Sequence, residues 1–350
     1  GTTAIASADM IGSGNLRLGG GTLEVNATQD STFNQAVQVT SATTINADGS
    51  NSAVILTFGG AMTGSGALSL NAGDSRIYLT QASGLTGDLT ISSSGPDSLV
   101  AAINSSTLGT GQITLTNGAT LGIAGPTRTF TNNIVLAGDA TLRTGDSSGG
   151  TITFSGVISE SGGSRNLTTY AYTSGGGTAI ELTGLNTYTG TTTVVGGKLM
   201  VASDANLGAG NILLNGGTLN VTGATTIDNA VAVSASSTIQ VDAATTLSGI
   251  ISGGGNLAKT GSESLTLTGI QTHSGNVILS AGTLSVASDA NLTSGNIVFN
   301  GGTLAVTGAT TIDNNIAFNV SRSGTIEANA AATLSGVLSG SGSFIKTGSA

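Results

Sequence analysis

The sequence predicts an all-β fold, a three-sided parallel β-helix (β-solenoid) with about 20 residues per coil. Three observations predict this fold: short β-branched runs separated by small polar residues, aliphatic rows that recur with one short period, and Asn-Gly turns just before strands. The 350 residues are therefore expected to form one continuous solenoid segment, 1–350, and not a set of globular domains.

The composition supports a folded β-protein. Glycine contributes 56 residues, proline only 2, and charged residues 8% of the chain, against roughly 25% charged residues in average soluble domains. The apolar runs have the length of strands, and none approaches the ~18 residues of a membrane-spanning helix. Abundant Thr, Val and Ile favour strands and argue against disorder.

The charge balance excludes some classes of partner. The chain carries 9 Lys and Arg against 18 Asp and Glu, which gives a formal net charge of -9. Nucleic acid and insertion into a membrane are therefore not expected. The absence of cysteine excludes a disulfide framework and thiolate metal sites, and it suits a chain that is exported unfolded. No signal peptide precedes Gly1, so the segment is expected to be an internal or processed piece of a longer protein.

Long internal repeats are the strongest signal. The heptapeptide VASDANL occurs at 201–207 and again at 286–292. Weaker copies of the surrounding sequence lie at 10–25 and 107–123. Aligned on these copies, the chain divides into macro-repeats at approximately 1–100, 101–197, 198–282 and 283–350, the last one truncated.

A shorter period runs within each macro-repeat. Leu199, Leu219 and Ile239 follow one another at intervals of about 20 residues. In the last macro-repeat this first row continues as Leu284–Leu304–Ile326. A second row is Ile297–Ile316–Val337, and a third comprises the pairs Ile227–Leu247 and Ile312–Leu334. Three rows with one period predict three strands per coil, with inward side chains stacked on those of the next coil. About sixteen or seventeen coils at roughly 4.8 Å each predict a rod roughly 80 Å long.

The turn residues agree with this interpretation. Asn-Gly occurs at 117–118, 215–216 and 300–301, in each case just before the start of a strand. Glycine and asparagine tolerate positive φ and so fit tight corners between strands.

Each candidate site has an ordinary structural role as its alternative. His273, the single histidine, stands at the position that Tyr188 has in N-T-Y-T-G, and a turn role is favoured over a metal site or catalytic triad. Asp204 and Asp289 repeat in S-D-A-N-L. We expect them about four coils, or roughly 19 Å, apart, too far for a glycosidase pair. They and the T-I-D-N residues Asp228 and Asp313 are predicted to form Asx turns.

Other candidates are weaker. Gly-Asp pairs at 73–74, 87–88, 138–139 and 145–146 make calcium the most plausible ion, but the calcium β-roll nonapeptide is not matched, so turns are favoured and no metal is predicted. Threonine-rich faces, such as 191–193, could form flat rows of hydroxyl groups that bind ice or glycans. A solvated strand surface is the favoured interpretation of these residues. Tyr170 and Tyr172, in a stretch expected to protrude as a loop, are the residues at which a contact site is expected if one exists.

Several segments resemble a known family. The segments ELTGLNTYTGTTTV (181–194), LAKTGSESLTLTG (257–269) and FIKTG (344–348) resemble the passenger-associated transport repeat of Gram-negative autotransporter passenger domains. The stretch 270–286 departs from that pattern. The resemblance implies a right-handed β-helix, export across two membranes, and a parent protein with a C-terminal membrane barrel. The family defines no catalytic residues, so none is transferred.

The sequence thus predicts a structural and adhesive rod, a segment of a secreted or cell-surface autotransporter-like adhesin of a Gram-negative bacterium. It is not expected to be an enzyme, and no cofactor or catalytic residue is predicted. Its expected partners are other copies of itself, end to end or side by side, or a host or environmental surface. One alternative is a self-assembling filament or biofilm-matrix protein. Another is a polysaccharide-processing β-helix enzyme, which would require clustered acids and aromatic platforms.

Overall fold

The computed structural model describes residues 1–47, 54–94, 98–103, 106–116, 118–144, 149–171 and 178–350. The fold is all-β, with 50% strand and 3% helix, and forms a parallel β-solenoid of about 15 turns with about 21 residues per turn. The predicted parallel β-helix is therefore confirmed. The number of turns is slightly below the expected sixteen or seventeen because several coils are longer than the expected period, such as the coil from Ile45 to its partner Leu70.

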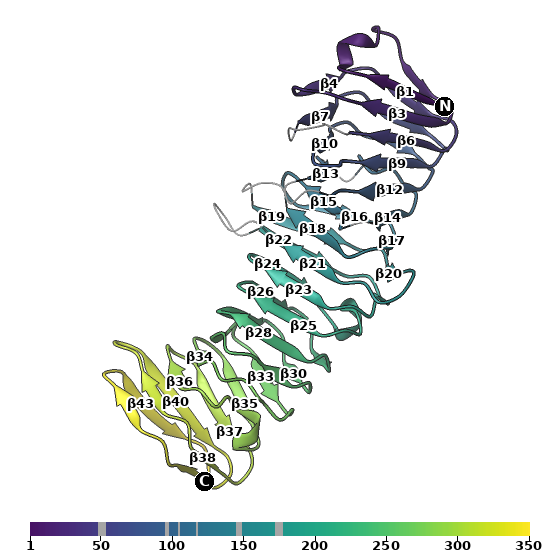
Figure 1. Cartoon of the computed structure of the whole chain (residues 1–350). Coiled ribbons are helices and arrows are strands. Elements are labelled where there is room, and N and C mark those ends of the chain that lie inside the picture. The colour runs from purple at the N-terminus through teal and green to yellow at the C-terminus, as the bar shows by residue number, and fades with distance from the viewer. Residues whose placement is uncertain (48–53, 95–97, 104–105, 117, 145–148, 172–177) are drawn as a thin grey trace. The chain divides into compact units, whose positions relative to one another are not determined.

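The chain forms two compact units, Gly1–Gly190 (unit 1) and Thr191–Ala350 (unit 2). Each unit has three sides, and in each the chain runs from one side to the next and returns one coil further along (Figure 1). All ladders between named strands are parallel, as expected when each strand pairs with its counterpart in the next coil.

Unit 1 has three sides, here named 1a, 1b and 1c. Sheet 1a contains β1 (Thr2–Ile5), β3 (Gly21–Val25), β6 (Thr43–Asn46), β9 (Leu68–Asn71), β12 (Leu89–Ser92), β14 (Ile113–Thr116), β17 (Ile134–Leu136) and β20 (Ile158–Glu160). Sheet 1b contains β4 (Ser31–Phe33), β7 (Ile55–Phe58), β10 (Arg76–Leu79), β13 (Leu99–Ala102), β15 (Thr120–Ile123), β18 (Ala140–Thr144) and β21 (Leu167–Tyr170). Side 1c contains β2 (Leu16–Leu18), β5 (Val37–Val39), β8 (Met62–Gly64) and β11 (Gly84–Leu85), then β16 (Arg128–Phe130), β19 (Gly150–Phe154) and β22 (Thr178–Leu182). A short 3-10 helix, η1 (Ala8–Met10), lies against β4.

Unit 2 repeats this plan with sides 2a, 2b and 2c. Side 2a contains β23 (Thr192–Val195), β25 (Ile212–Asn215), β28 (Val231–Ala235) and β31 (Ile251–Ser252), and further along β38 (Thr310–Ile312) and β41 (Ala332–Leu334). Sheet 2b contains β24 (Lys198–Val201), β26 (Thr218–Val221), β29 (Ser237–Val241), β32 (Leu257–Thr260), β34 (Val277–Leu279), β36 (Ile297–Phe299), β39 (Ile316–Phe318) and β42 (Leu338–Gly340). Side 2c contains β27 (Thr225–Ile227), β30 (Thr245–Leu247), β33 (Ser264–Leu267), β35 (Thr283–Val286), β37 (Thr303–Val306), β40 (Ser323–Ala328) and β43 (Ser343–Thr347). Two 3-10 helices, η2 (Asp204–Asn206) and η3 (Asp289–Asn291), occupy corners.

The core consists of the inward residues of successive strands. Leu219 pairs with Leu199 on one side and Ile239 on the other, and all three side chains are fully buried. Phenylalanines stack in the same way, with ring centroids 4.9 Å apart for Phe33–Phe58, 5.6 Å for Phe130–Phe154 and 5.1 Å for Phe299–Phe318. Because each row contacts only the next coil, stability is approximately a sum of neighbouring interfaces.

One predicted row position is wrong. Ile316 pairs with Leu338, not with Val337, whose side chain is 66% exposed. The other rows predicted within unit 2, such as Ile227–Leu247 and Ile312–Leu334, are confirmed.

The corners are fastened by side-chain amides and carboxylates. The N–H of Asn276 donates to Oδ1 of Asn256 at 3.0 Å, and the N–H of Asn296 donates to Oδ1 of Asn276 at 3.0 Å. In unit 1 the N–H of Val157 donates to Oδ1 of Asn133 at 3.0 Å. The polar corner residues therefore extend the inter-coil hydrogen bonding beyond the strands.

Within each unit, the long repeat advances by one side between its two copies. The strand TLNV, β26, lies in sheet 2b, whereas its repeat TLAV, β37, lies in 2c. In unit 1 the corresponding strands β3 and β15 lie in 1a and 1b. The interval between the copies that begin at Val201 and Val286 is not a whole number of coils, and the excess carries the chain around one further corner. Equal sequences therefore face different directions.

Candidate functional site

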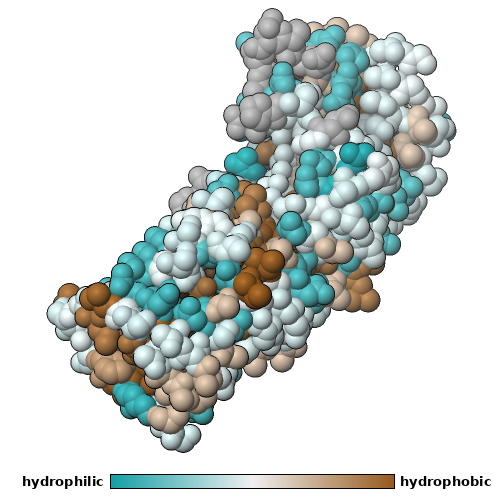
Figure 2. All heavy atoms as spheres, turned by 60° about the horizontal axis from the view of Figure 1, so that its bottom comes forward, coloured by the Kyte–Doolittle hydropathy of each residue, from teal (hydrophilic) through white to brown (hydrophobic). Residues whose placement is uncertain are grey.

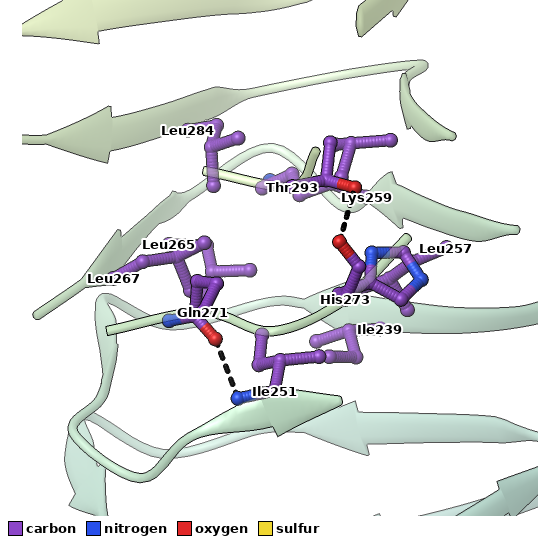
Figure 3. A pocket seen from close by; sticks show the side chains of 11 residues that line it. Ile239, Ile251, Leu257, Lys259, Leu265, Leu267, Gln271, His273, Leu284 and Thr293 are labelled. Carbon is purple, nitrogen blue, oxygen red and sulfur yellow. Dashed lines mark hydrogen bonds between the residues drawn. The ribbon is translucent and has the colours of Figure 1, made fainter. Parts of the chain in front are cut away.

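A small cavity inside unit 2 brings together four polar side chains, three of them buried. It has a volume of about 20 Å³ and lies among inward aliphatic residues, with Lys259, Gln271, His273 and Thr293 as its polar members. Figure 3 shows these side chains converging from consecutive coils of unit 2. A volume of this size holds a single water molecule.

Lys259 occupies a core position. It stands in the row between Ile239 and Leu279, and its side chain is only 2% exposed. Its Nζ donates to the carbonyl oxygens of Thr260 at 3.0 Å, Gly261 at 3.0 Å, Glu263 at 2.6 Å and Ala281 at 3.1 Å.

The environment of Lys259 perturbs its pKa. Burial lowers the pKa of Lys259 to about 8, in opposition to the charges of Glu263 and Asp242, which raise it. The four carbonyl oxygens satisfy the ammonium group within the protein, as a buried charge requires.

His273 lies at a corner and is 2% exposed. Its Nε2 is 2.6 Å from the carbonyl oxygen of Gly255 in the preceding coil. One coil later, the hydroxyl of Thr293 donates to the carbonyl oxygens of His273 at 3.0 Å and Gly275 at 2.6 Å (Figure 3). His273 thus belongs to a stack of corner residues that bind backbone carbonyls. Tyr188, to which it corresponds in the sequence, is also buried.

Asparagines perform the same task at other corners. Nδ2 of Asn314 donates to the carbonyl oxygens of Thr293 at 2.6 Å and Gly295 at 2.8 Å. Nδ2 of Asn229 bridges two carbonyls of its own preceding coil, at 2.9 and 2.6 Å. The arrangement of the interior polar groups therefore holds one coil to the next and leaves no space for a substrate larger than water.

The repeated aspartates form separate corners. Asp204 and Asp289 begin η2 and η3, and their Oδ1 atoms accept the N–H of Asp228 and Asp313, each at 3.3 Å. Asp204 and Asp289 lie on different sides of unit 2, because the repeat has advanced by one side between them. Burial raises the pKa of Asp204, and the neighbouring Asp228 adds to this through its charge but lowers it through its backbone hydrogen bond.

The Gly-Asp sequences also serve corners. Oδ1 of Asp88 accepts the N–H of Gln112 at 3.1 Å, and Oδ1 of Asp139 accepts the N–H of Asn166 at 2.8 Å. Gly145-Asp146 lies outside the described residues. Within the described ranges, no three His, Cys, Asp or Glu side chains gather in a way that could hold a metal ion.

A groove on the outer surface of sheet 1b lies beside Tyr170. It has a volume of about 100 Å³ and is lined mainly by Arg76, Tyr78, Leu99, Ala101, Gly122 and Arg143. Arg143 pairs with Tyr170 of the next coil, and its guanidinium carbon lies 5.2 Å from the centre of the Tyr170 ring. We name this feature the arginine–tyrosine groove. Tyr172, predicted beside Tyr170 as a contact residue, lies outside the described residues.

Hydroxyl rows cover other faces. On sheet 1a the outward residues Thr22 and Thr44 pair across neighbouring strands, and Thr90 pairs with Thr114. On 2c, Thr226 and Thr246 stand side by side. These rows give the surface its polarity without charge.

Comparisons with known proteins do not assign this chain to a family. No protein-family model, no curated protein sequence and no solved structure matches this chain. None of the helices among the described residues is long and apolar enough to cross a membrane.

Sequence reasoning missed both Lys259 and the groove. Lys259 follows Ile239 by one full coil, so the row period alone assigns it to the interior. The groove signal is subtler. Gly122 and Arg143 lie one coil apart, directly after the row residues Leu121 and Leu142, which makes them outward neighbours.

Proposed function

We propose that this chain is part of a rigid structural and adhesive rod of a bacterial surface or secreted protein. One observation carries the proposal: the inward rows remain in register over many coils. In sheet 2b the row runs from Leu199 through Ile239 and Leu279 to Phe299, with one inward position in every coil. Strands paired on both sides, with interlocked side chains between coils, make such a segment stiff along its axis.

The surface chemistry suits a role outside the cell. The face seen in Figure 2 is largely pale or hydrophilic, with hydrophobic atoms gathered in a few patches. Outward threonine, serine and asparagine supply this polarity, since only 8% of residues are charged. The assignment to Gram-negative surface proteins rests on the N-T-Y-T-G and K-T-G segments described above.

The distribution of polar groups favours structure over catalysis. Lys259 and His273 lie in the interior and bind backbone carbonyl oxygens. Asp204 and Asp289 lie on different sides of unit 2. A hydrolase of polysaccharides requires two carboxyl groups within roughly 5–10 Å at an open cleft.

Three experiments test this proposal. Protease treatment and antibody labelling of intact cells that produce the parent protein should remove and detect this segment. Confinement of the segment to the cytosol would contradict the surface assignment. Electron microscopy of the purified chain should show separate short rods. Long fibres would favour a self-assembling filament, and turnover of any polysaccharide in a panel would favour an enzyme.

A further inference from the structure

The arginine–tyrosine groove gathers functional groups that are scarce in this chain. Two of its six arginines and one of its four tyrosines line the groove, and Tyr170 lies against Arg143. Within the described residues, none of the lining side chains carries a carboxylate. The groove is thus a locally basic and aromatic place on a chain with a net charge of -9.

Small residues create the hollow. Across strands β10, β13, β15 and β18 the outward row is Tyr78, Ala101, Gly122 and Arg143. Figure 1 shows these four strands in succession. Ala101 and Gly122 are small and buried, and Leu99 packs beside Gly122, so the hollow lies between Leu99 and the larger side chains of Tyr78 and Arg143. The volume of about 100 Å³ is several times what one water needs. It therefore admits one small chemical group or part of a sugar ring.

Arg143 is available for a ligand. In the described part of the chain its guanidinium makes the contact with the Tyr170 ring and no hydrogen bond or ion pair. A guanidinium that lies over an aromatic ring keeps its in-plane N–H donors free, and these match the two oxygens of a carboxylate. The ring restrains the side chain, which lowers the entropy lost on binding.

Two classes of macromolecule fit poorly. Strands β10, β13, β15 and β18 are each paired on both sides, so no open edge is present among them to bind a peptide by strand addition. A densely charged polyanion such as nucleic acid is repelled by the overall negative charge. A ligand with one carboxylate among neutral hydroxyl groups avoids both obstacles.

We infer that the arginine–tyrosine groove binds a single carboxylate-bearing sugar unit within an otherwise neutral glycan. The carboxylate pairs with Arg143, and part of the sugar ring lies in the groove beside Tyr78 and Leu99. This inference stands independently of the rod proposal, because it concerns one surface of unit 1.

Binding of two matched probes to the purified chain tests the inference. Methyl glucuronide carries the carboxylate, and methyl glucoside is its uncharged counterpart. Titration followed by NMR should give millimolar binding of the glucuronide and at least tenfold weaker binding of the glucoside. Arg143→Gln should weaken glucuronide binding about tenfold or more, since it removes a charge-assisted pair. Arg322→Gln, which removes an exposed arginine in unit 2, should leave binding unchanged.

A second variant tests the shape of the groove without a change of charge. The φ of Gly122 is an ordinary strand value, and a Cβ there would lie 3.2 Å from Cδ1 of Leu99. Gly122→Val should fill part of the hollow beside Leu99 and abolish binding, with circular dichroism and thermal unfolding as checks on folding. Equal binding of both probes, no binding of either, or an equal loss with Arg322→Gln would overturn the inference. Tighter binding of a glucoside phosphate than of the glucuronide would reassign the groove to phosphate.

Discussion

The ammonium group of Lys259 donates a hydrogen bond of 3.1 Å to the carbonyl oxygen of Ala281, which lies in the following coil. The same group also binds carbonyls in its own coil, including that of Glu263 at 2.6 Å. A single buried cation thus joins two coils through backbone atoms, at a position where neighbouring coils have aliphatic side chains.

Lys259 should make the stability of unit 2 depend on pH. Its pKa is about 8 in the folded chain, against 10.5 ordinarily, so the folded state binds fewer protons between these values. The free energy of unfolding should therefore rise from about pH 8 to pH 10 relative to that of Lys259→Met. The measurement is urea unfolding of both proteins across this range.

Lys346→Met is the matched control, because it changes an exposed lysine in the same K-T-G sequence. It should leave the pH dependence of the wild type unaltered. A wild type and a Lys259→Met variant whose stabilities run parallel from pH 8 to 10 would show that the buried amine does not titrate there.

The side-chain amide of Asn314 should contribute strongly to the free energy of unfolding. Asn314→Ala leaves the buried carbonyl oxygens of Thr293 and Gly295 without their donor, and each unsatisfied group costs about 1–3 kcal/mol. We expect a loss of about 2–4 kcal/mol in the free energy of unfolding, and a similar loss for Asn229→Ala. Asn319→Ala, at an exposed position, should change it by less than about 0.5 kcal/mol. Equal losses of unfolding free energy in Asn314→Ala and Asn319→Ala would show that Asn314 does not stabilise the fold by bridging two carbonyl groups.

The stacked phenylalanines should dominate local stability in the last described coils. Phe299 is fully buried and stacks on Phe318, whereas Phe344 is 47% exposed. Phe299→Ala should cost about 3–5 kcal/mol and Phe344→Ala clearly less. Hydrogen exchange should show the loss of protection to be greatest in the coils adjacent to residue 299, since interactions are between nearest neighbours. Uniform loss of protection throughout unit 2 would contradict this.

The sequence was sufficient to predict the solenoid and most of its rows, because aliphatic residues on a strand of period two leave few choices of register. The row through Leu219 and Ile239 is as predicted. The row that ends at Val337 is not, because two adjacent aliphatic residues, Val337 and Leu338, leave the inward position undecided over so short a strand.

The polar features are harder to predict for physical reasons. Lysine is almost never fully buried, so residue type argues against a core position for Lys259 although its spacing places it there. The arginine–tyrosine groove depends on which outward side chains are small in adjacent coils. The coil from Arg143 to Tyr170 is longer than the regular period, so the period alone does not bring the two together. Nearly identical sequences, such as the copies that begin at Val201 and Val286, suggest that they occupy the same side of the solenoid. They lie on different sides, because the interval between them is not a whole number of coils.

The carboxylate of Asp204 should reduce stability at neutral pH. Burial raises its pKa, so the folded state holds the proton more tightly than the unfolded state does. Stability from this group is present at low pH and is lost as pH rises through the folded pKa, which lies above the ordinary value of 3.8.

Asp204→Asn removes the charge but keeps an oxygen that accepts the N–H of Asp228. The variant should therefore melt at a higher temperature than the wild type at pH 7, and the difference should vanish near pH 3. Asp9→Asn, which changes an exposed residue of η1, should leave the melting temperature unaltered at both values. A variant at position 204 that is less stable at pH 7 would mean that the charged form contributes to the corner, contrary to the effect of its burial.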